Sequence, residues 1–78
     1  MQKKHKLVIF GITEFAEIAY EYFTYDSEYE VVGFCIDSKY LTKTVCCGLP
    51  VVPFEEVEQH FPSADHHFYA AMVYTLLN

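Results

Sequence analysis

The chain has 78 residues, which is enough for one small domain with a narrow margin of stability. Apolar residues make up 53% of it and aromatic residues 18%, so a packed core is expected and intrinsic disorder is excluded. The net charge of −6 argues against nucleic-acid binding, and the apolar runs are too short for insertion into a membrane.

The N-terminal third of the chain predicts a strand followed by a helix. Residues 6–10, KLVIF, are branched or aromatic and end at Gly11, which is typical of a strand buried on both faces. From Thr13 onward apolar residues recur at helical spacing, with glutamates on the other side. The pattern predicts an amphipathic helix whose apolar side is formed by Phe15, Ile18, Ala19, Tyr22 and Phe23.

A second strand follows the helix and completes a βαβ unit. Residues 31–36 are continuously apolar and are closed by Asp37, a pattern that indicates an interior parallel strand. Strand, helix and strand within about 30 residues make the βαβ unit from which doubly wound sheets are built.

The second half of the chain predicts three further elements. Residues 48–52 predict a short strand, placed at a sheet edge because Pro50 and Pro53 cannot donate to a ladder. Residues 54–61 predict a helix of about two turns, and residues 67–73 predict a third main strand. We therefore expect an α/β, small Rossmann-like domain with a mainly parallel sheet of three to four strands and flanking helices. Since no helix follows the last strand, we interpret the chain as truncated, a fragment of a longer protein.

The carboxyl ends of these strands form the expected ligand-binding edge of the sheet. Gly11 begins the first strand-to-helix turn, where free N–H groups and the helix dipole attract an anion. Asp37 ends the second strand, where an acid commonly holds a hydroxyl of a bound nucleotide. Tyr74 and Thr75 end the third strand and would line the same crevice, with Thr75 also resembling a helix N-cap.

The same turn also fits an ordinary connection without a ligand. Thr13 and Ala16 stand at the second and third glycine positions of the dinucleotide-binding fingerprint. Glu14 and Glu17 lie in the first turn of the helix, where they satisfy the dipole and repel phosphate. Both interpretations, a modified binding loop and a plain turn, stay open at this point.

The histidines and cysteines do not predict a site of their own. His66 and His67 are adjacent on a strand and point to opposite faces, so they cannot easily share a metal ion. Cys35, Cys46 and Cys47 are odd in number, and a bridge between neighbours would strain the peptide between them, which favours reduced thiols. With no secretion signal at the N-terminus, we expect a soluble cytoplasmic protein without metal or catalytic residues.

Four segments together resemble a known family. The segments KLVIFGITEFAEIAYEYF, YEVVGFCID, GLPVVPFEEVE and FYAAMVYTLLN resemble, in order and spacing, the N-terminal domain of sugar O-acyltransferases of the sialic acid O-acetyltransferase type. That family includes bacterial nucleotide-sugar N-acetyltransferases. The resemblance covers nearly all of residues 1–78 and implies a Rossmann-like domain that precedes a left-handed β-helix of hexapeptide repeats, absent from this chain, in a homotrimeric enzyme.

The resemblance also implies a role. This domain would help to hold a sugar or nucleotide-sugar acceptor, while acetyl-CoA, required by the full-length enzyme, binds between the β-helices. The catalytic histidine belongs to the second domain, so this chain would contain no catalytic residue and no cofactor. The family's glycine-rich turn falls on residues 11–16, its acidic strand end on Asp37 and Ser38, and its third strand end on residues 73–75. The implied substrate-binding residues are Gly11, Thr13, Phe15, Asp37, Ser38, Tyr74 and Thr75.

Two other functions compete with this one. The βαβ start also fits a dinucleotide (NAD)-binding module of an oxidoreductase or redox sensor. The acidic first helical turn and the many aromatic residues fit a domain that binds no small ligand and serves in assembly. A fragment would expose apolar surface normally covered by the rest of a longer protein, so we expect it to be able to self-associate.

Overall fold

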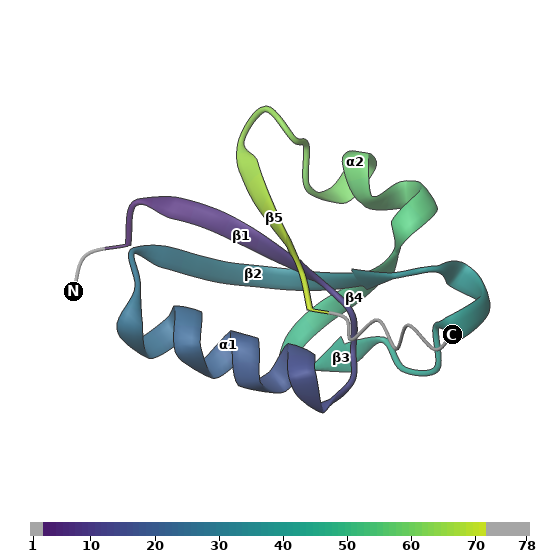
Figure 1. The fold of residues 1–78 in the computed structure, drawn as a ribbon. Helices are drawn as coiled ribbons and strands as arrows, with labels where there is room; N and C mark the ends of the chain where they lie inside the picture. The colour runs from purple at the N-terminus through teal and green to yellow at the C-terminus, as the bar shows by residue number, and fades with distance from the viewer. Residues whose placement is uncertain (1–2, 72–78) are drawn as a thin grey trace, which may run out of the picture.

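A computed structural model describes residues 3–71 of the chain. Within this range the strands are β1 (His5–Phe10), β2 (Tyr29–Ile36), β3 (Val45–Cys46), β4 (Leu49–Pro53) and β5 (His66–Ala70). The helices are α1 (Glu14–Asp26) and α2 (Val57–His60), with 3₁₀ turns η1 (Ser38–Tyr40) and η2 (Phe54–Glu56). The strands form one sheet in the order β3-β4-β2-β1-β5 (Figure 1).

The sheet has the predicted α/β character. β1 pairs in parallel with β2 and β5, and β2 pairs in parallel with β4. The chain first proceeds from β1 to β2 and β4, and then crosses to the other side of β1 to form β5. This reversal at β1 is the Rossmann-like arrangement, so the predicted fold class is confirmed.

A short hairpin adds a strand beyond the three to four that the sequence predicts. β3 runs antiparallel to β4, with Val45 opposite Pro50 and Cys46 opposite Leu49. The two residues between the strands, Cys47 and Gly48, have φ angles of 54° and 79°, as tight hairpins with two-residue loops require. The usual Asn-Gly or Asp-Gly signal is absent from this turn, so the sequence pattern did not reveal it.

The prediction that β4 is an edge strand is wrong. β4 lies between β3 and β2, and β3 forms the edge. The prolines are tolerated because of where they stand in the ladders. Pro50 precedes the residues paired with β2, and the N–H of Val51 donates to the Thr44 carbonyl at 2.9 Å. The nitrogen of Pro53 faces the same side of β4 as the nitrogen of Val51, the side on which β3 lies. β3 ends before it reaches Pro53, so no hydrogen-bond donor is needed there.

The two faces of the sheet are covered by different elements. α1 lies on one face, and η2 and α2 lie on the other (Figure 1). Under α1 the core is built around Ile9 and Phe34, both fully buried, and under α2 it is built around Val8 and Cys35. β2 contains a β-bulge, since Leu7 of β1 pairs with Val31 whereas the next residue, Val8, pairs with Gly33.

The bulge changes which residues of β2 face α1. Phe34 and Ile36 point into the α1 core, while Cys35 packs in the α2 core. Gly33 lies beneath the Phe61 ring, and a Cβ at this position would stand 2.5 Å from the ring carbon Cζ. The absence of a side chain at Gly33 therefore allows the Phe61 ring, at the end of α2, to pack directly on the sheet.

α1 is helical as predicted, but the predicted apolar side is only partly buried. Ala16 is fully buried, and Ala19, Tyr20 and Phe23 pack against the sheet core. In contrast, Phe15, Ile18 and Tyr22 are exposed. Helical periodicity groups apolar residues by spacing and does not identify which of them meet the strands.

Both ends of α1 are fixed to neighbouring elements. At the C-terminal end, the Lys3 ammonium donates to the carbonyls of Phe23, Thr24 and Ser27 at 3.0, 2.6 and 3.0 Å. A cation at this position also interacts favourably with the helix dipole. At the other end, the Gly11 N–H donates to the Cys35 carbonyl at 2.8 Å.

Gly11 occupies a position that no other residue fits without strain. Its φ angle is 129°, and an added Cβ would stand 2.8 Å from the Ala71 carbonyl oxygen. The N–H of Ala71 in turn donates to the Phe10 carbonyl at 2.9 Å. The close approach of the turn after β1 to the end of β5 therefore depends on the missing side chain.

We expect Gly11→Ala to lower the free energy of unfolding by about 2–4 kcal/mol, because backbone strain and a clash with a carbonyl add together. Urea unfolding followed by circular dichroism measures this. The matched control is Gly48→Ala, which also has positive φ but has open space within 4 Å of the point where its Cβ would stand, and should cost about 1 kcal/mol. Equal losses in the two variants would show that the Ala71 contact is unimportant.

Candidate functional site

A crevice of about 280 Å³ opens at the carboxyl end of β1. It lies where the strand order reverses, between the ends of β1 and β5 and the start of α1. In open α/β sheets this is the location at which ligands bind. The lining residues are Gly11, Ile12, Thr13, Glu14, Phe15, Ile36 and Ala71.

The structure brings together part of the predicted site. Gly11, Thr13 and Phe15 line the crevice. Asp37 and Ser38 follow β2 at the same end of the sheet but are not among the lining residues. The two remaining predicted residues, Tyr74 and Thr75, lie outside the described residues.

The Thr13 side chain is available to a ligand. Thr13 is the N-cap residue of α1, and its carbonyl accepts hydrogen bonds from the N–H groups of Ala16 and Glu17 at 2.9 and 3.2 Å. Its hydroxyl makes no capping hydrogen bond, and the residue is exposed. The helix therefore leaves this hydroxyl free to donate to, or accept from, a polar group in the crevice.

The crevice is mainly apolar and carries a negative charge. Ile12, Phe15, Ile36 and Ala71 contribute apolar surface, and the Glu14 side chain supplies the charge in the first turn of α1. A carboxylate at this position repels phosphate but accepts hydrogen bonds from hydroxyl groups. The crevice therefore suits a neutral ring with hydroxyl substituents better than a pyrophosphate.

Ser38 is held by a residue that the sequence did not point to. Glu55, in η2, accepts hydrogen bonds from the Ser38 N–H at 3.2 Å and from its hydroxyl at 3.0 Å. The backbone N–H of Glu55 itself, followed by the Ser38 hydroxyl, lowers the pKa of the Glu55 carboxyl below its ordinary value. The contact fixes the turn after β2 to the turn after β4. The contact joins residues 17 positions apart, so no local sequence motif predicts it.

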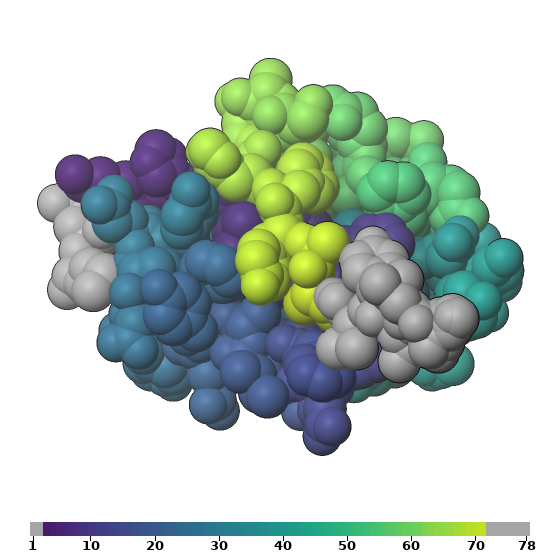
Figure 2. All heavy atoms as spheres, viewed as in Figure 1, coloured from purple at the N-terminus to yellow at the C-terminus, as the bar shows by residue number. Residues whose placement is uncertain are grey.

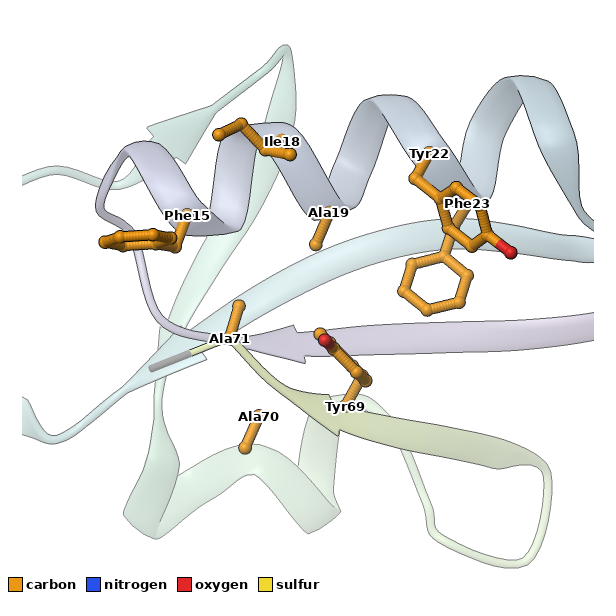
Figure 3. Close-up of a pocket in the computed structure, with 8 residues that line it drawn as sticks. All are labelled: Phe15, Ile18, Ala19, Tyr22, Phe23, Tyr69, Ala70 and Ala71. Atoms are coloured by element: carbon orange, nitrogen blue, oxygen red, sulfur yellow. The ribbon is translucent and has the colours of Figure 1, made fainter. Parts of the chain in front are cut away.

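A second hollow continues from the crevice along α1. This groove, of about 510 Å³, shares Phe15 and Ala71 with the crevice and is bounded by α1 and β5 (Figure 3). Ala19 and Phe23 point from α1 towards the strands, and the Tyr69 ring meets the Phe23 ring edge-on at 5.1 Å. The helical spacing grouped Phe15 with the apolar side of α1 and gave no sign of a groove along that side. The lining residues are Phe15, Ile18, Ala19, Tyr22, Phe23, Tyr69, Ala70 and Ala71.

A polar hollow of about 650 Å³ lies at the amino ends of β1 and β5. His5 and His67 stand beside it, with ring centroids 5.0 Å apart, and the Nδ1 atom of His66 lies 2.9 Å from the Pro62 carbonyl oxygen. Among residues 3–71, no three histidine, cysteine, aspartate or glutamate side chains gather closely enough to hold a metal ion. This hollow is at the end of the parallel sheet away from the expected ligand edge.

The cysteines of the described region are free thiols. The Cys46 and Cys47 sulfur atoms lie 3.9 Å apart and are not bonded. Burial raises the pKa of Cys35 to about 11. Desolvation, followed by the neighbouring Cys46 and Glu17, raises the pKa of Cys47 to about 11. At neutral pH the Cys35 and Cys47 thiols carry little thiolate, the form that reacts with electrophiles.

No model of a known protein family, no curated protein and no solved structure matches this chain. The resemblance to sugar acyltransferases therefore rests on the four quoted sequence segments alone. Neither helix within residues 3–71 has the length and apolar character needed to cross a membrane.

The Ser38–Glu55 contact should persist to a lower pH than the ordinary pKa of a glutamate allows. Because the folded-state pKa of Glu55 is lowered, the contact is present above the ordinary glutamate pKa of 4.5 and is lost only as the pH falls through the lower folded value. We expect the amide NMR signal of Ser38 to shift as the Glu55 carboxyl is protonated, with a midpoint below pH 4.5. In Glu55→Gln this shift should disappear. A midpoint at or above pH 4.5 would contradict the geometry.

Cys47 should react slowly with iodoacetamide although it is exposed. A pKa of about 11 in place of 9.0 leaves about a hundredfold less thiolate at pH 8. We expect a rate about a hundredfold below that of a short peptide with the sequence KTVCCG, rising about tenfold per pH unit towards pH 11. Glu17→Gln should raise the rate, since it removes one cause of the shift. A rate independent of pH above 8 would show an already ionised thiol.

Proposed function

We propose that this chain is the acceptor-recognition domain of an acetyl-CoA-dependent sugar O- or N-acetyltransferase. It would hold a sugar or nucleotide-sugar at the carboxyl end of β1 and would not catalyse the reaction alone. One observation carries the proposal. The turn that resembles the family's binding turn forms the wall of a crevice at the strand-order reversal, with Gly11, Thr13 and Phe15 on it.

The chemistry of the crevice favours the sugar part of such an acceptor. The Thr13 hydroxyl and the Glu14 carboxylate offer hydrogen bonds to sugar hydroxyls, and the Phe15 ring offers an apolar face for a sugar or base ring. Phosphate groups would lie away from the N-terminus of α1, because Glu14 already occupies that region. Asp37, beside the crevice, would accept a hydrogen bond from a ribose or sugar hydroxyl.

The role of this chain in the reaction would be positioning. In the whole enzyme, the acceptor amine or hydroxyl attacks the thioester carbon of acetyl-CoA, coenzyme A leaves as the thiol, and a base outside this chain takes the acceptor proton. Holding the acceptor in one orientation lowers the entropic part of that barrier. The residues of the crevice would therefore affect acceptor binding and orientation rather than the chemistry at the thioester.

An NAD-binding module is the second candidate, and one observation favours it. Ala16 is fully buried and lies near Gly11, and a small residue is what the third glycine position of the dinucleotide fingerprint requires. Thr13 replaces the second glycine, however, and Glu14 replaces a neutral residue at the pyrophosphate position. These two side chains make the sugar acceptor the better choice.

Calorimetric titration with a uridine diphosphate sugar, NAD and acetyl-CoA tests the proposal. We expect heat from the uridine compound alone. Thr13→Val and Asp37→Asn should each weaken its binding by about tenfold, through loss of one hydrogen bond or of one charged acceptor. The matched control is Asp65→Asn, which removes the same charge near the amino end of β5 and should bind normally. Heat from NAD alone would support the second candidate, and no heat from any compound would rule out both.

A further inference from the structure

α1 carries a second apolar stripe that the sheet does not use. Phe15, Ile18, Tyr22 and Tyr25 follow one another at intervals of three, four and three residues. Their exposed fractions are 47%, 63%, 55% and 72%. We call these four residues the outer stripe. The spacing is that of the a and d positions at which one helix packs against another.

Three residues of the outer stripe, Phe15, Ile18 and Tyr22, line the groove between α1 and β5. Tyr69, on β5, is 45% exposed and forms part of the opposite wall (Figure 3). In the space-filling view, the yellow-green atoms of β5 lie at the surface beside the blue atoms of α1 (Figure 2). Single exposed apolar side chains are ordinary, but a contiguous apolar patch beside a groove marks an interaction surface.

The charge of α1 indicates the chemistry of the partner. The helix contains the acids Glu14, Glu17, Glu21 and Asp26 and no base. Within residues 3–71 none of these acids forms an ion pair. Glu14 and Glu21 are helical neighbours of Ile18 and Tyr25, so they border the outer stripe on one side. Lys3, at the C-terminal end of α1, is engaged with carbonyl groups.

We propose that the outer stripe and Tyr69 form a docking groove for a basic amphipathic helix of a partner protein. Such a helix would place apolar side chains at three- and four-residue intervals into the groove and lysines or arginines beside Glu14 and Glu21. A second copy of this chain fits less well, since two α1 helices would bring their acids together without any base on either helix. The segment after Ala71, MVYTLLN, has no basic residue and likewise lacks the complementary charge.

Two designed peptides of about 15 residues test the proposal by fluorescence anisotropy. Both have leucines at three- and four-residue intervals. One carries lysines beside the leucines and the other carries glutamates. We expect the basic peptide to bind at least about tenfold more tightly than the acidic one, and its affinity to fall as the salt concentration rises.

Variants locate the binding on the outer stripe. Tyr22→Ser should weaken binding of the basic peptide by about tenfold or more. Its control is Tyr40→Ser in η1, an aromatic residue with a similar exposed fraction of 59%, which should leave the affinity unchanged. Glu21→Lys should also weaken binding, whereas Glu30→Lys, an exposed acid on β2, should weaken it far less. None of these residues lines the sugar crevice, so loss of sugar binding would leave these results unaffected.

Four outcomes would overturn the proposal. Equal affinity for the two peptides, or no binding of either, would remove the charge argument. Dimerisation in sedimentation experiments that Tyr22→Ser abolishes would show that a second copy occupies the groove. A loss of several degrees in Tm in both Ile18→Ser and Tyr22→Ser, without peptide binding, would show that residues of the chain itself cover the outer stripe.

Discussion

The arrangement of this domain depends on the close contact between the Gly11 backbone and the Ala71 carbonyl group. Gly11 is also bonded to β2 through the Cys35 carbonyl, and Ala71 to β1 through the Phe10 carbonyl, so three strands are fixed to one another at this turn. A side chain at position 11 would separate β5 from β1 and remove one wall of the crevice. Packing alone therefore explains the glycine at position 11, whether or not a ligand binds. Information about the ligand comes from the side chains of Thr13, Glu14 and Phe15.

Local patterns were sufficient for the main elements of the fold. β1, α1 and β2 each coincide with a run of characteristic spacing, and their order defines the α/β class. The hairpin of β3 and β4 was not predicted because its turn uses Cys47 at positive φ, where the sequence signal is usually asparagine, aspartate or glycine. The interior position of β4 follows from that hairpin. The only sequence feature associated with the bulge in β2 is Gly33. Its role could not be predicted, because it depends on contact with Phe61, which is distant in sequence.

The candidate site was predictable where it lies on one continuous turn and not where it joins distant segments. Gly11, Thr13 and Phe15 are close in sequence and line the crevice together. The engagement of Ser38 by Glu55 and the position of Tyr69 opposite α1 depend on the pairing of strands. For α1, spacing identified the apolar residues but did not separate Phe15, Ile18 and Tyr22, which are exposed, from the residues that meet the sheet. Apolar residues are numerous enough on this helix to form two adjoining stripes, and only the strands decide which of them is covered.

The packing of the Phe61 ring on Gly33 restricts which residues can replace either of them during evolution. Once the bulge in β2 has turned position 33 towards α2, the space above that backbone is filled by an aromatic ring from a segment far along the chain. A side chain at position 33 therefore requires a smaller residue at position 61, together with a small shift of the Pro50 carbonyl oxygen, which would stand 3.2 Å from the added Cβ. The two positions form a pair whose substitutions are expected to covary. Such a pair would serve to align distant homologues across the segment of residues 38–48, where the spacing of elements gives little guidance.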